Sequence, residues 1–266
     1  MKPESYAISQ DSGFLFRLRH AFRGTLVWYS FVLPPLFLIL IFIGYPTAIT
    51  FRQSFFSETP GGGEEFAGTH HFERLFDSNV FWGAVANTFL LGFAYLVIII
   101  PVATIFASML NRIRRGSTPL KVIYFLPQLT SSVAVAIMFN YVFQPDWGLL
   151  NGTLHALGFQ QLPLWLSDPR LTFGGSRAAV TLLAVWAGLG YFIIIVLAGL
   201  QSIPTDLYDA AAIDGASPVQ AWRYVTLPSL RPTFIFLIIT GSIDALSRFG
   251  DLWTLGGPGG SPARSL

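Results

Sequence analysis

Residues 178–205 read AAVTLLAVWAGLGYFIIIVLAGLQSIPT, a run of 28 residues without a single Asp, Glu, Lys or Arg. About 20 apolar residues are enough for an α-helix to cross the hydrocarbon core of a bilayer. Charged residues are also absent from 24–51, 78–111 and 122–145, which are runs of 28, 34 and 24 residues. A fifth apolar run follows Arg231, although it contains charged residues. These runs decide the fold class, because each of them can hold one membrane-spanning helix.

The composition supports the same fold class. Hydrophobic residues make up 53% of the 266 residues and charged residues only 11%, and the mean hydropathy is +0.57. A soluble domain would have about 25% charged residues. The strands of a membrane β-barrel would be about 10 residues long and alternate in polarity, which these runs do not. We therefore predict an all-α, polytopic transmembrane helix bundle with spans near 28–49, 88–110, 122–143, 178–200 and 233–252.

The first apolar run is too long for a secretory signal, and no convincing small-residue cleavage site follows it. We expect an uncleaved first span, with an N-terminal segment at 1–27 and a transmembrane domain at 28–266. Pro34, Pro35, Pro101 and Pro127 lie within the first three spans and predict bends in a packed bundle. The chain has no cysteine, which excludes disulfides, thiol chemistry and cysteine metal sites.

The basic residues predict which ends of the spans face the cytoplasm. Segments 1–27, 111–121 and 201–232 together hold ten Lys and Arg residues, whereas the segments on the opposite side of the spans hold five. Short loops rich in Lys and Arg stay in the cytoplasm, and 111–121 is the most informative of them because it is short and strongly basic. We therefore predict a multi-pass protein of the cell (inner) membrane with its N-terminus in the cytoplasm.

The loop between the fourth and fifth spans has the signals of two short helices, which we call the knob (residues 203–231). Thr205 is placed as the N-cap of the first helix, and Gly215 as the left-handed residue that follows its end. Ser217 and Pro218 predict an N-cap followed by proline at the first helical position, and the second helix is expected to end before Pro228. The alternative is a helix lying on the lipid headgroups, which the three aspartates of this loop disfavour.

The knob carries a resemblance to a known family. The pattern Glu-Ala-Ala, three residues, Gly, nine residues, Ile-x-Leu-Pro is typical of the permease subunits of binding-protein-dependent ABC importers. Here Asp209 replaces the Glu and Val225 replaces the Ile, while every spacing is kept. The residues of this site are Asp209, Ala210, Ala211, Asp214, Gly215, Leu227 and Pro228.

Further features are similar to the carbohydrate branch of that family, the maltose and glycerol-phosphate type of permease. They are Asn87-Thr88, Leu126-Pro127, Gly148-Leu149-Leu150-Asn151 and Gly256-Gly257-Pro258. The stretch before Gly256 is shorter than is usual in the family. The chain also ends at Leu266, where the family has a further span, so five spans are visible of the six that a type I importer permease is expected to have.

The resemblance implies that the knob sits in a groove of a separate ATPase subunit. No Gly-rich phosphate loop ending in Lys-Ser or Lys-Thr occurs here, so ATP and Mg are expected on that partner, with no cofactor bound by this chain. The implied partners are a second homologous permease, two ATPase subunits, an extracellular binding protein, membrane lipid and a sugar or related polyol. No nucleic-acid partner and no enzymatic activity are expected.

The fifth span contains three ionisable residues, Asp244, Arg248 and Asp251. An ionisable group in lipid costs at least about 2.5–3.5 kcal/mol, so these side chains should face protein or a water-filled cavity. Asp244 and Arg248 can pair along one helical face, and twelve residues separate Asp244 from Arg231, which places it near the membrane midplane. They either line a substrate pathway or form a structural ion pair. Further pathway candidates, each of which could instead be a packing residue, are Asn140, Tyr141, Trp186 and Tyr191.

Three functions are weighed against these residues. The first is a permease subunit of an ATP-driven importer for a sugar or polyol. The second is a secondary transporter or channel driven by an ion gradient, in which Asp244 and Arg248 act as a relay. The third, an intramembrane enzyme, is disfavoured because the spans contain no Ser–Lys, Ser–His, paired-Asp or His-Glu-x-x-His arrangement. Nor does the sequence predict a metal site, since His70, His71 and His155 are expected on the surface of outer loops.

Overall fold

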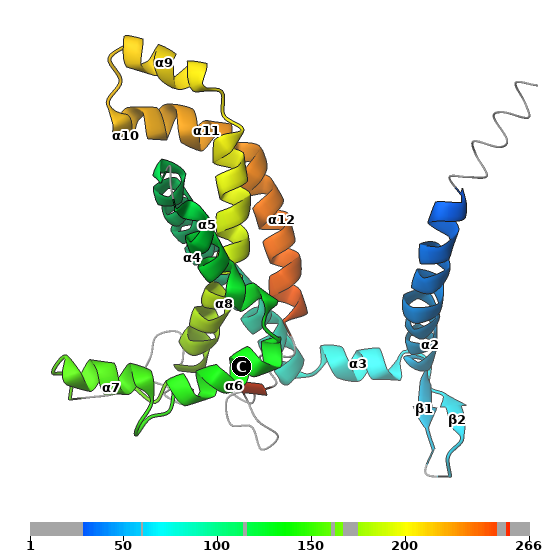
Figure 1. Ribbon diagram of the computed structural model, residues 1–266. Coiled ribbons are helices and arrows are strands. Elements are labelled where there is room, and N and C mark those ends of the chain that lie inside the picture. Colours follow the sequence, from blue (N-terminus) through cyan, green and yellow to red (C-terminus); the bar gives the residue numbers. More distant parts are fainter. Residues whose placement is uncertain are drawn as a thin grey trace, which may run out of the picture. The chain divides into compact units, whose positions relative to one another are not determined.

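The computed structural model describes residues 29–59, 61–113, 116–160, 163–166, 175–248 and 254–255. The predicted N-terminal segment at 1–27 lies outside the described residues. The chain divides into two compact units, Met1–Asn79 and Val80–Leu266. The described residues of both units are mainly helical, as predicted for an all-α bundle (Figure 1).

The first unit contains one membrane-spanning helix and a small outer element. The helix runs from Tyr29 to Gln53 and widens into a π-turn, η1 (Leu40–Gly44), before α2 (Tyr45–Gln53). Two short antiparallel strands that the sequence did not predict follow, and then one short helix. These elements are β1 (Phe56–Glu58), β2 (Glu64–Phe66) and α3 (His70–Phe76).

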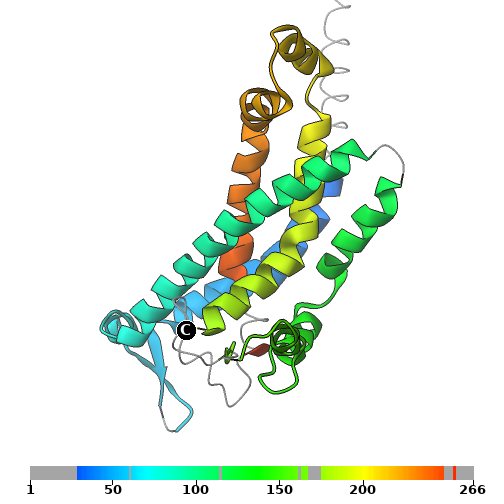
Figure 2. The ribbon, with the colours of Figure 1, turned by 90° about the vertical axis from the view of Figure 1, so that its left-hand side faces the viewer.

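The second unit holds the remaining spans. Among the described residues of both units, three helices are long and apolar enough to cross a membrane, and up to five spans result when each of two bent helix pairs is taken as one, by length and composition. In Figure 2 the long helix α4 crosses α8 and α12 obliquely. The span-forming elements are α4 (Asn79–Arg112), α5 (Ser117–Phe125), η2 (Leu126–Leu129), α6 (Ser132–Val142), α8 (Gly175–Gln201) and α12 (Arg231–Ser247).

Two predicted spans differ from the structure. The segment predicted as one span at 122–143 is broken, because Thr130 is extended and the helices on its two sides meet at 98°. Pro127, which lacks a backbone donor, starts the 3₁₀ turn that precedes this break. The fifth span ends earlier than the predicted Leu252, since the backbone leaves helical geometry at Arg248 (φ −76°, ψ 70°).

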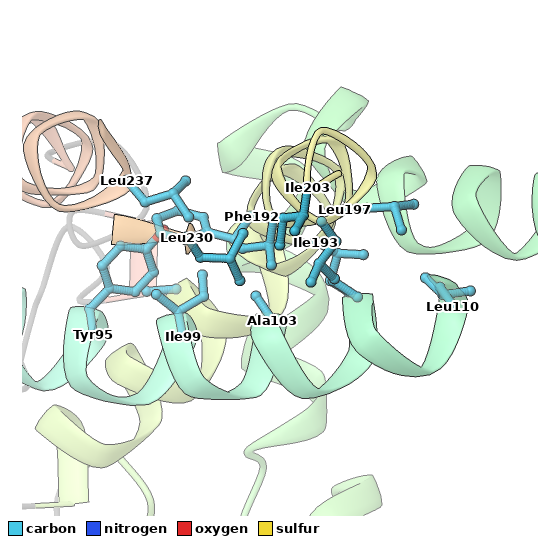
Figure 3. Close-up of a cluster of buried hydrophobic side chains, with 14 residues drawn as sticks. Tyr95, Ile99, Ala103, Leu110, Phe192, Ile193, Leu197, Ile203, Leu230 and Leu237 are labelled. Atoms are coloured by element: carbon cyan, nitrogen blue, oxygen red, sulfur yellow. The ribbon is translucent and has the colours of Figure 1, made fainter. Parts of the chain in front are cut away.

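Close helix packing at glycines holds the second unit together. Tyr95, Ile99 and Ala103 point from one side of α4 toward α8, where they meet Phe192 and Ile193 (Figure 3). A methyl group added at any of three α8 glycines would collide with a neighbouring element, and the element differs from one glycine to the next. Gly188 faces the Tyr95 hydroxyl on α4, Gly190 faces the backbone of Tyr124 and Phe125, and Gly199 faces Thr233 and Leu230.

The segment after α6 is fixed by one buried amide. Asn151 lies in α7 (Leu149–Ala156) and is 1% exposed. Its Nδ2 donates to the carbonyls of Pro145 (2.9 Å) and Pro163 (3.2 Å), and its Oδ1 accepts from Trp165 Nε1 (2.8 Å). Gly148 precedes the helix because a Cβ there would meet the backbone of Gln144. The Gly148–Asn151 motif is therefore a device that folds this outer loop.

Gly190→Ala tests the glycine packing. The added methyl would lie 2.8 Å from Phe125 Cα and closer still to the Tyr124 carbonyl, and backbone cannot move aside as a flexible side chain can. We expect a loss of about 1–3 kcal/mol of unfolding free energy, measured by thermal unfolding in mild detergent. Gly83→Ala is the matched control, because nothing lies within 4 Å of its added methyl. Equal stability of the two variants would contradict the packing described here.

Candidate functional site

The knob consists of two stacked helical segments at one end of α8 and α12 (Figures 1 and 2). Its elements are α9 (Thr205–Ile213), α10 (Pro218–Ala221), η3 (Trp222–Thr226) and α11 (Leu227–Ser229). The two predicted helices are confirmed. The predicted N-cap at Thr205 is wrong by one residue, since Pro204 has extended backbone (ψ 135°) and Thr205 is already helical. The proline ring fixes φ and leaves the residue without a backbone N–H donor. Pro204 is therefore the last residue of the segment that links α8 to α9.

The turn between the helices is closed by backbone hydrogen bonds. Gly215 has φ +75°, the left-handed conformation predicted for it. Its N–H donates to the Ala212 carbonyl (3.1 Å), and the N–H of Ala216 donates to the Ala211 carbonyl (2.9 Å). This pair of bonds is a Schellman motif, which satisfies the last carbonyls of a helix and requires a residue without Cβ strain at the left-handed position.

The second helix starts as predicted but does not end where predicted. Ser217 and Gln220 form a capping box, in which the Ser217 N–H donates to Gln220 Oε1 (2.7 Å) and the Gln220 N–H donates to Ser217 Oγ (3.4 Å). The helix then widens into the π-turn η3, where the Leu227 N–H donates to the Trp222 carbonyl, and it continues through Pro228 to Ser229. The wider turn makes room for the proline ring, so Pro228 bends the chain without ending the helix.

One buried hydrogen bond joins the two helices of the knob. The hydroxyl groups of Tyr208 on α9 and Thr226 on η3 lie 3.0 Å apart, and Thr226 is 4% exposed. Ile203 and Leu230, at the two ends of the knob, are buried in the same apolar cluster as the side chains of α4 and α8. The knob is therefore attached rigidly to the transmembrane helices at both ends.

The outer surface of the knob combines apolar and acidic side chains. Ile213 is 86% exposed at the end of α9, and Leu207 is also exposed. Asp209, Ala210 and Asp214 lie on the surface, as do Gly215 and Pro228, while Ala211 and Leu227 are half-buried. A short helix with an exposed apolar tip and small side chains can lie in a groove of a partner protein.

A second cluster of polar residues lies where α4 and α12 meet. Arg248 pairs with Asp244 as predicted, with Nη2 2.8 Å and Nε 3.2 Å from Asp244 Oδ2. The Tyr95 hydroxyl also donates to Oδ2 (3.3 Å), and the Arg248 guanidinium lies over the Tyr95 ring, 5.3 Å from its centroid. None of the described residues donates a hydrogen bond to the other oxygen, Asp244 Oδ1. The Asp244 side chain is 49% exposed.

Two neighbouring cavities share this carboxylate. One, of about 250 Å³, is lined by polar side chains of the broken third span and of α12, and the other, of about 180 Å³, lies between α4, α8 and α12. Asp244 and Gln128 line both of them. Further polar lining residues are Thr130, Ser132, Ser247 and Arg248 in the first cavity, and Tyr95, Tyr191 and Thr240 in the second. Hydroxyl, amide and carboxylate groups of this kind can hydrogen-bond a polyhydroxylated ligand.

The remaining pathway candidates lie elsewhere. Trp186 packs edge-on against Phe139, with ring centroids 5.3 Å apart, and Asn140 Nδ2 donates to the Thr254 carbonyl (3.4 Å). Asp251 lies outside the described residues. In the part of the chain that is described, no three His, Asp or Glu residues are grouped to hold a metal ion.

Sequence reasoning missed Tyr95 and Gln128. Tyr95 belongs to the charge-free run 78–111. A tyrosine hydroxyl in such an apolar span needs a hydrogen-bond partner, and this need could have identified Tyr95 as a residue of a polar cluster. Gln128 directly follows Pro127 in the apolar run 122–145, and a polar amide in such a span could have identified it as a residue of the same polar cluster.

Comparison with known proteins identifies the family of these helices. Residues 99–262 match the family described as binding-protein-dependent transport system inner membrane component. The lactose transport system permease protein of Rhizobium radiobacter is 34% identical over 237 residues, which cover 88% of this chain and 78% of the relative. The trehalose/maltose transport system permease protein of Thermococcus litoralis is 32% identical over 243 residues, covering 90% and 81%.

Solved structures show the same fold. A crystal structure of a bacterial alginate ABC transporter in complex with an alginate pentasaccharide-bound periplasmic protein contains a chain that is 27% identical, with a TM-score of 0.68, covering 85% of this chain and 74% of that one. A crystal structure of a bacterial ABC transporter involved in the import of the acidic polysaccharide alginate gives 26% identity and a TM-score of 0.69, covering 90% and 83%.

A double-mutant cycle with Asp244→Ala and Arg248→Ala tests the inner ion pair. The Arg248 side chain is 16% exposed and the Asp244 side chain 49%, so removing Asp244 takes an ionic partner from a largely buried guanidinium. We expect a coupling free energy of about 0.5–3 kcal/mol, measured by unfolding in mild detergent. The exposed pair Arg52–Glu64 (2.9 Å; 62% and 46% exposed) is the control, expected at about 0–1 kcal/mol. An inner coupling no larger than the control would show that the pair adds nothing to the bundle.

Proposed function

Because this chain belongs to the family of binding-protein-dependent transport system inner membrane components, we propose that it forms the translocation pathway of an ATP-driven importer for a sugar or related polyol. The family supports a multi-pass transport subunit of the inner membrane, and its members are permeases rather than enzymes. The substrate class rests on relatives named for lactose, trehalose/maltose and arabinooligosaccharide transport. The polar groups that line the two cavities are compatible with such a ligand.

The proposed complex contains four further subunits. They are a second homologous permease, two ATPase subunits that bind ATP and Mg, and an extracellular or periplasmic protein that delivers the substrate. A solved relative in complex with a pentasaccharide-bound periplasmic protein supports the last of these. The basic loop 111–121 supports an orientation with the knob and the N-terminus in the cytoplasm, where the ATPase is.

The knob is proposed as the coupling element. The observation that carries this proposal is its rigid attachment together with its exposed tip. Ile213 and Asp209 face outward, while Ile203 and Leu230 are buried among the spans. When the ATPase dimer closes, a groove that holds α9 would move it as a unit, and the buried ends would pass that movement to α8 and α12.

The cavities around Asp244 are proposed as part of the substrate pathway. Asp244 Oδ2 is held by Tyr95 and Arg248, so Oδ1 is the acceptor available to a ligand hydroxyl. Gln128 offers an amide to the same space, and the Tyr191 ring lines the second cavity. The broken third span is what brings Gln128 and Ser132 to this space.

Gly215→Val tests the coupling proposal in the reconstituted transporter. A β-branched residue is strained at φ +75°, so the Schellman turn would open and α9 would lose its orientation. We expect ATP hydrolysis stimulated by the loaded binding protein, and transport with it, to fall by at least about fivefold. Gly158→Val is the control, since Gly158 has the same left-handed backbone (φ +94°) beyond α7, away from the knob. Both rates are measured on the same proteoliposomes.

A direct contact test accompanies this variant. The chain has no cysteine, so Ala211→Cys carries the only thiol of this subunit and can hold a cross-linker. Capture of the ATPase subunit from Ala211→Cys, but not from Leu157→Cys on the opposite loop, is the expected result. Failure to capture the ATPase from α9 would exclude this loop as the coupling element.

Gln128→Ala tests the substrate pathway, and the energy source of transport separates the importer from the ion-gradient alternative. Loss of an amide shared by both cavities should raise the substrate concentration that half-saturates transport, by a factor of about 5–10 for one hydrogen bond, while transport still requires ATP. Under the alternative, in which Asp244 and Arg248 relay an ion, transport would persist without ATPase and follow an imposed ion gradient. Initial uptake rates with ATP, without ATP and with an ionophore distinguish the two.

A further inference from the structure

A third cavity lies between the end of α4 and the second helix of the knob, away from the proposed pathway. It has a volume of about 310 Å³ and is lined by Ile105, Ser108, Met109, Arg112, Pro218, Val219 and Trp222. Five of these seven residues are apolar, and Arg112 brings the one formal charge of this lining. An apolar slot that ends at a guanidinium can hold a molecule with a hydrocarbon part and an anionic part.

The depth of this cavity in the bilayer follows from the sequence. Arg112 is the last residue of α4 and directly follows the charge-free run 78–111. Ile105 and Met109 therefore lie within the hydrocarbon region, and Arg112 lies at its boundary. Trp222 borders the same cavity, and tryptophan favours the headgroup level, where its ring is partly apolar and its N–H is wet. The cavity spans the boundary between acyl chains and headgroups.

Charge and exposure determine the occupant. Ile105, Met109 and Val219 are 54%, 61% and 74% exposed, although each is apolar. Within the described residues Arg112 forms no salt bridge, and Arg114 and Arg115 follow it in the sequence, with Lys121 in α5. Basic pockets of this kind between spanning helices on the cytoplasmic side attract anionic lipid headgroups.

We propose that this cavity binds one anionic phospholipid of the cytoplasmic leaflet. Its phosphate accepts hydrogen bonds from Arg112, and its acyl chain lies against Ile105, Met109 and Val219. The bound lipid bridges α4 and α10, so it fixes the inner helix of the knob against the bundle. This inference rests on the cytoplasmic orientation proposed above, but it adds a regulator, the anionic lipid content of the membrane.

The test uses the assembled transporter in nanodiscs with equal amounts of phosphatidylglycerol and phosphatidylcholine, and retained lipids are counted by native mass spectrometry. Wild type should retain phosphatidylglycerol preferentially. Arg112→Gln should lower that retention about fivefold, the effect of one basic residue at an anionic surface. Arg223→Gln removes the same charge from the knob but does not line the cavity, and it should leave retention unchanged.

A second variant keeps the test decisive if Arg112→Gln does not assemble. Val219→Glu places a carboxylate on the cavity wall at an exposed position, so it should fold and repel the phosphate, whereas Val219→Gln should not repel it. Retention that ignores the headgroup, or that is unchanged in both charge variants, overturns the proposal. So does a cross-link from Val219→Cys to a polypeptide other than the ATPase, which would identify a protein occupant. Counting the retained lipids requires neither ATP nor sugar. The lipid result can therefore be interpreted even if the coupling proposal fails.

Discussion

Close approach of helices at the glycines of α8 is the contact on which the bundle depends. In lipid the hydrophobic effect does not drive helices together, because acyl chains are as apolar as leucine side chains. Association then depends on packing at short range, which small residues allow. Gly188, Gly190 and Gly199 let α8 touch α4, the α5–η2 segment and α12, respectively. One helix thus contacts three neighbours along its length, and the whole second unit is built around it.

The same core reaches the knob, because Ile203 and Leu230 at its two ends are buried among the side chains of the spans. Leu230 is fully buried and lies beside Gly199, while the helices on the two sides of Leu230 meet at 58°. The Tyr208–Thr226 hydrogen bond closes the knob on itself. The connections between the knob and the helices α8 and α12 are short, and they begin and end in packed side chains. A movement of α9 would therefore be passed to α8 and α12, because no flexible linker lies between them.

Periodicity and local chemistry were enough for much of this structure. Four charge-free runs and one apolar run with charges indicated the five apolar segments. The local rules for Gly215 and Ser217 predicted the turn and the cap, because these depend on near neighbours in the sequence. The bend predicted at Pro127 is present, but its size, a 98° break at Thr130, was not predicted, and the continuation of the helix past Pro228 was missed, since each depends on what surrounds a proline. A proline reduces helix stability, but tertiary packing decides whether the helix breaks, bends or widens.

The inner ion pair shows why the two interpretations of Asp244 do not exclude one another. If the pair only held the bundle together, we would expect both carboxylate oxygens to accept hydrogen bonds from the bundle. If it only bound substrate, we would expect no hydrogen bonds from neighbouring helices to the carboxylate. Here Oδ2 takes hydrogen bonds from Tyr95 and Arg248, which joins α4 to α12, while none of the described residues donates to Oδ1 and the carboxylate lines two cavities. The Tyr95 hydroxyl fits only because its neighbour on α8 is Gly188. The glycine packing that assembles the helices therefore also positions the carboxylate that lines the two cavities.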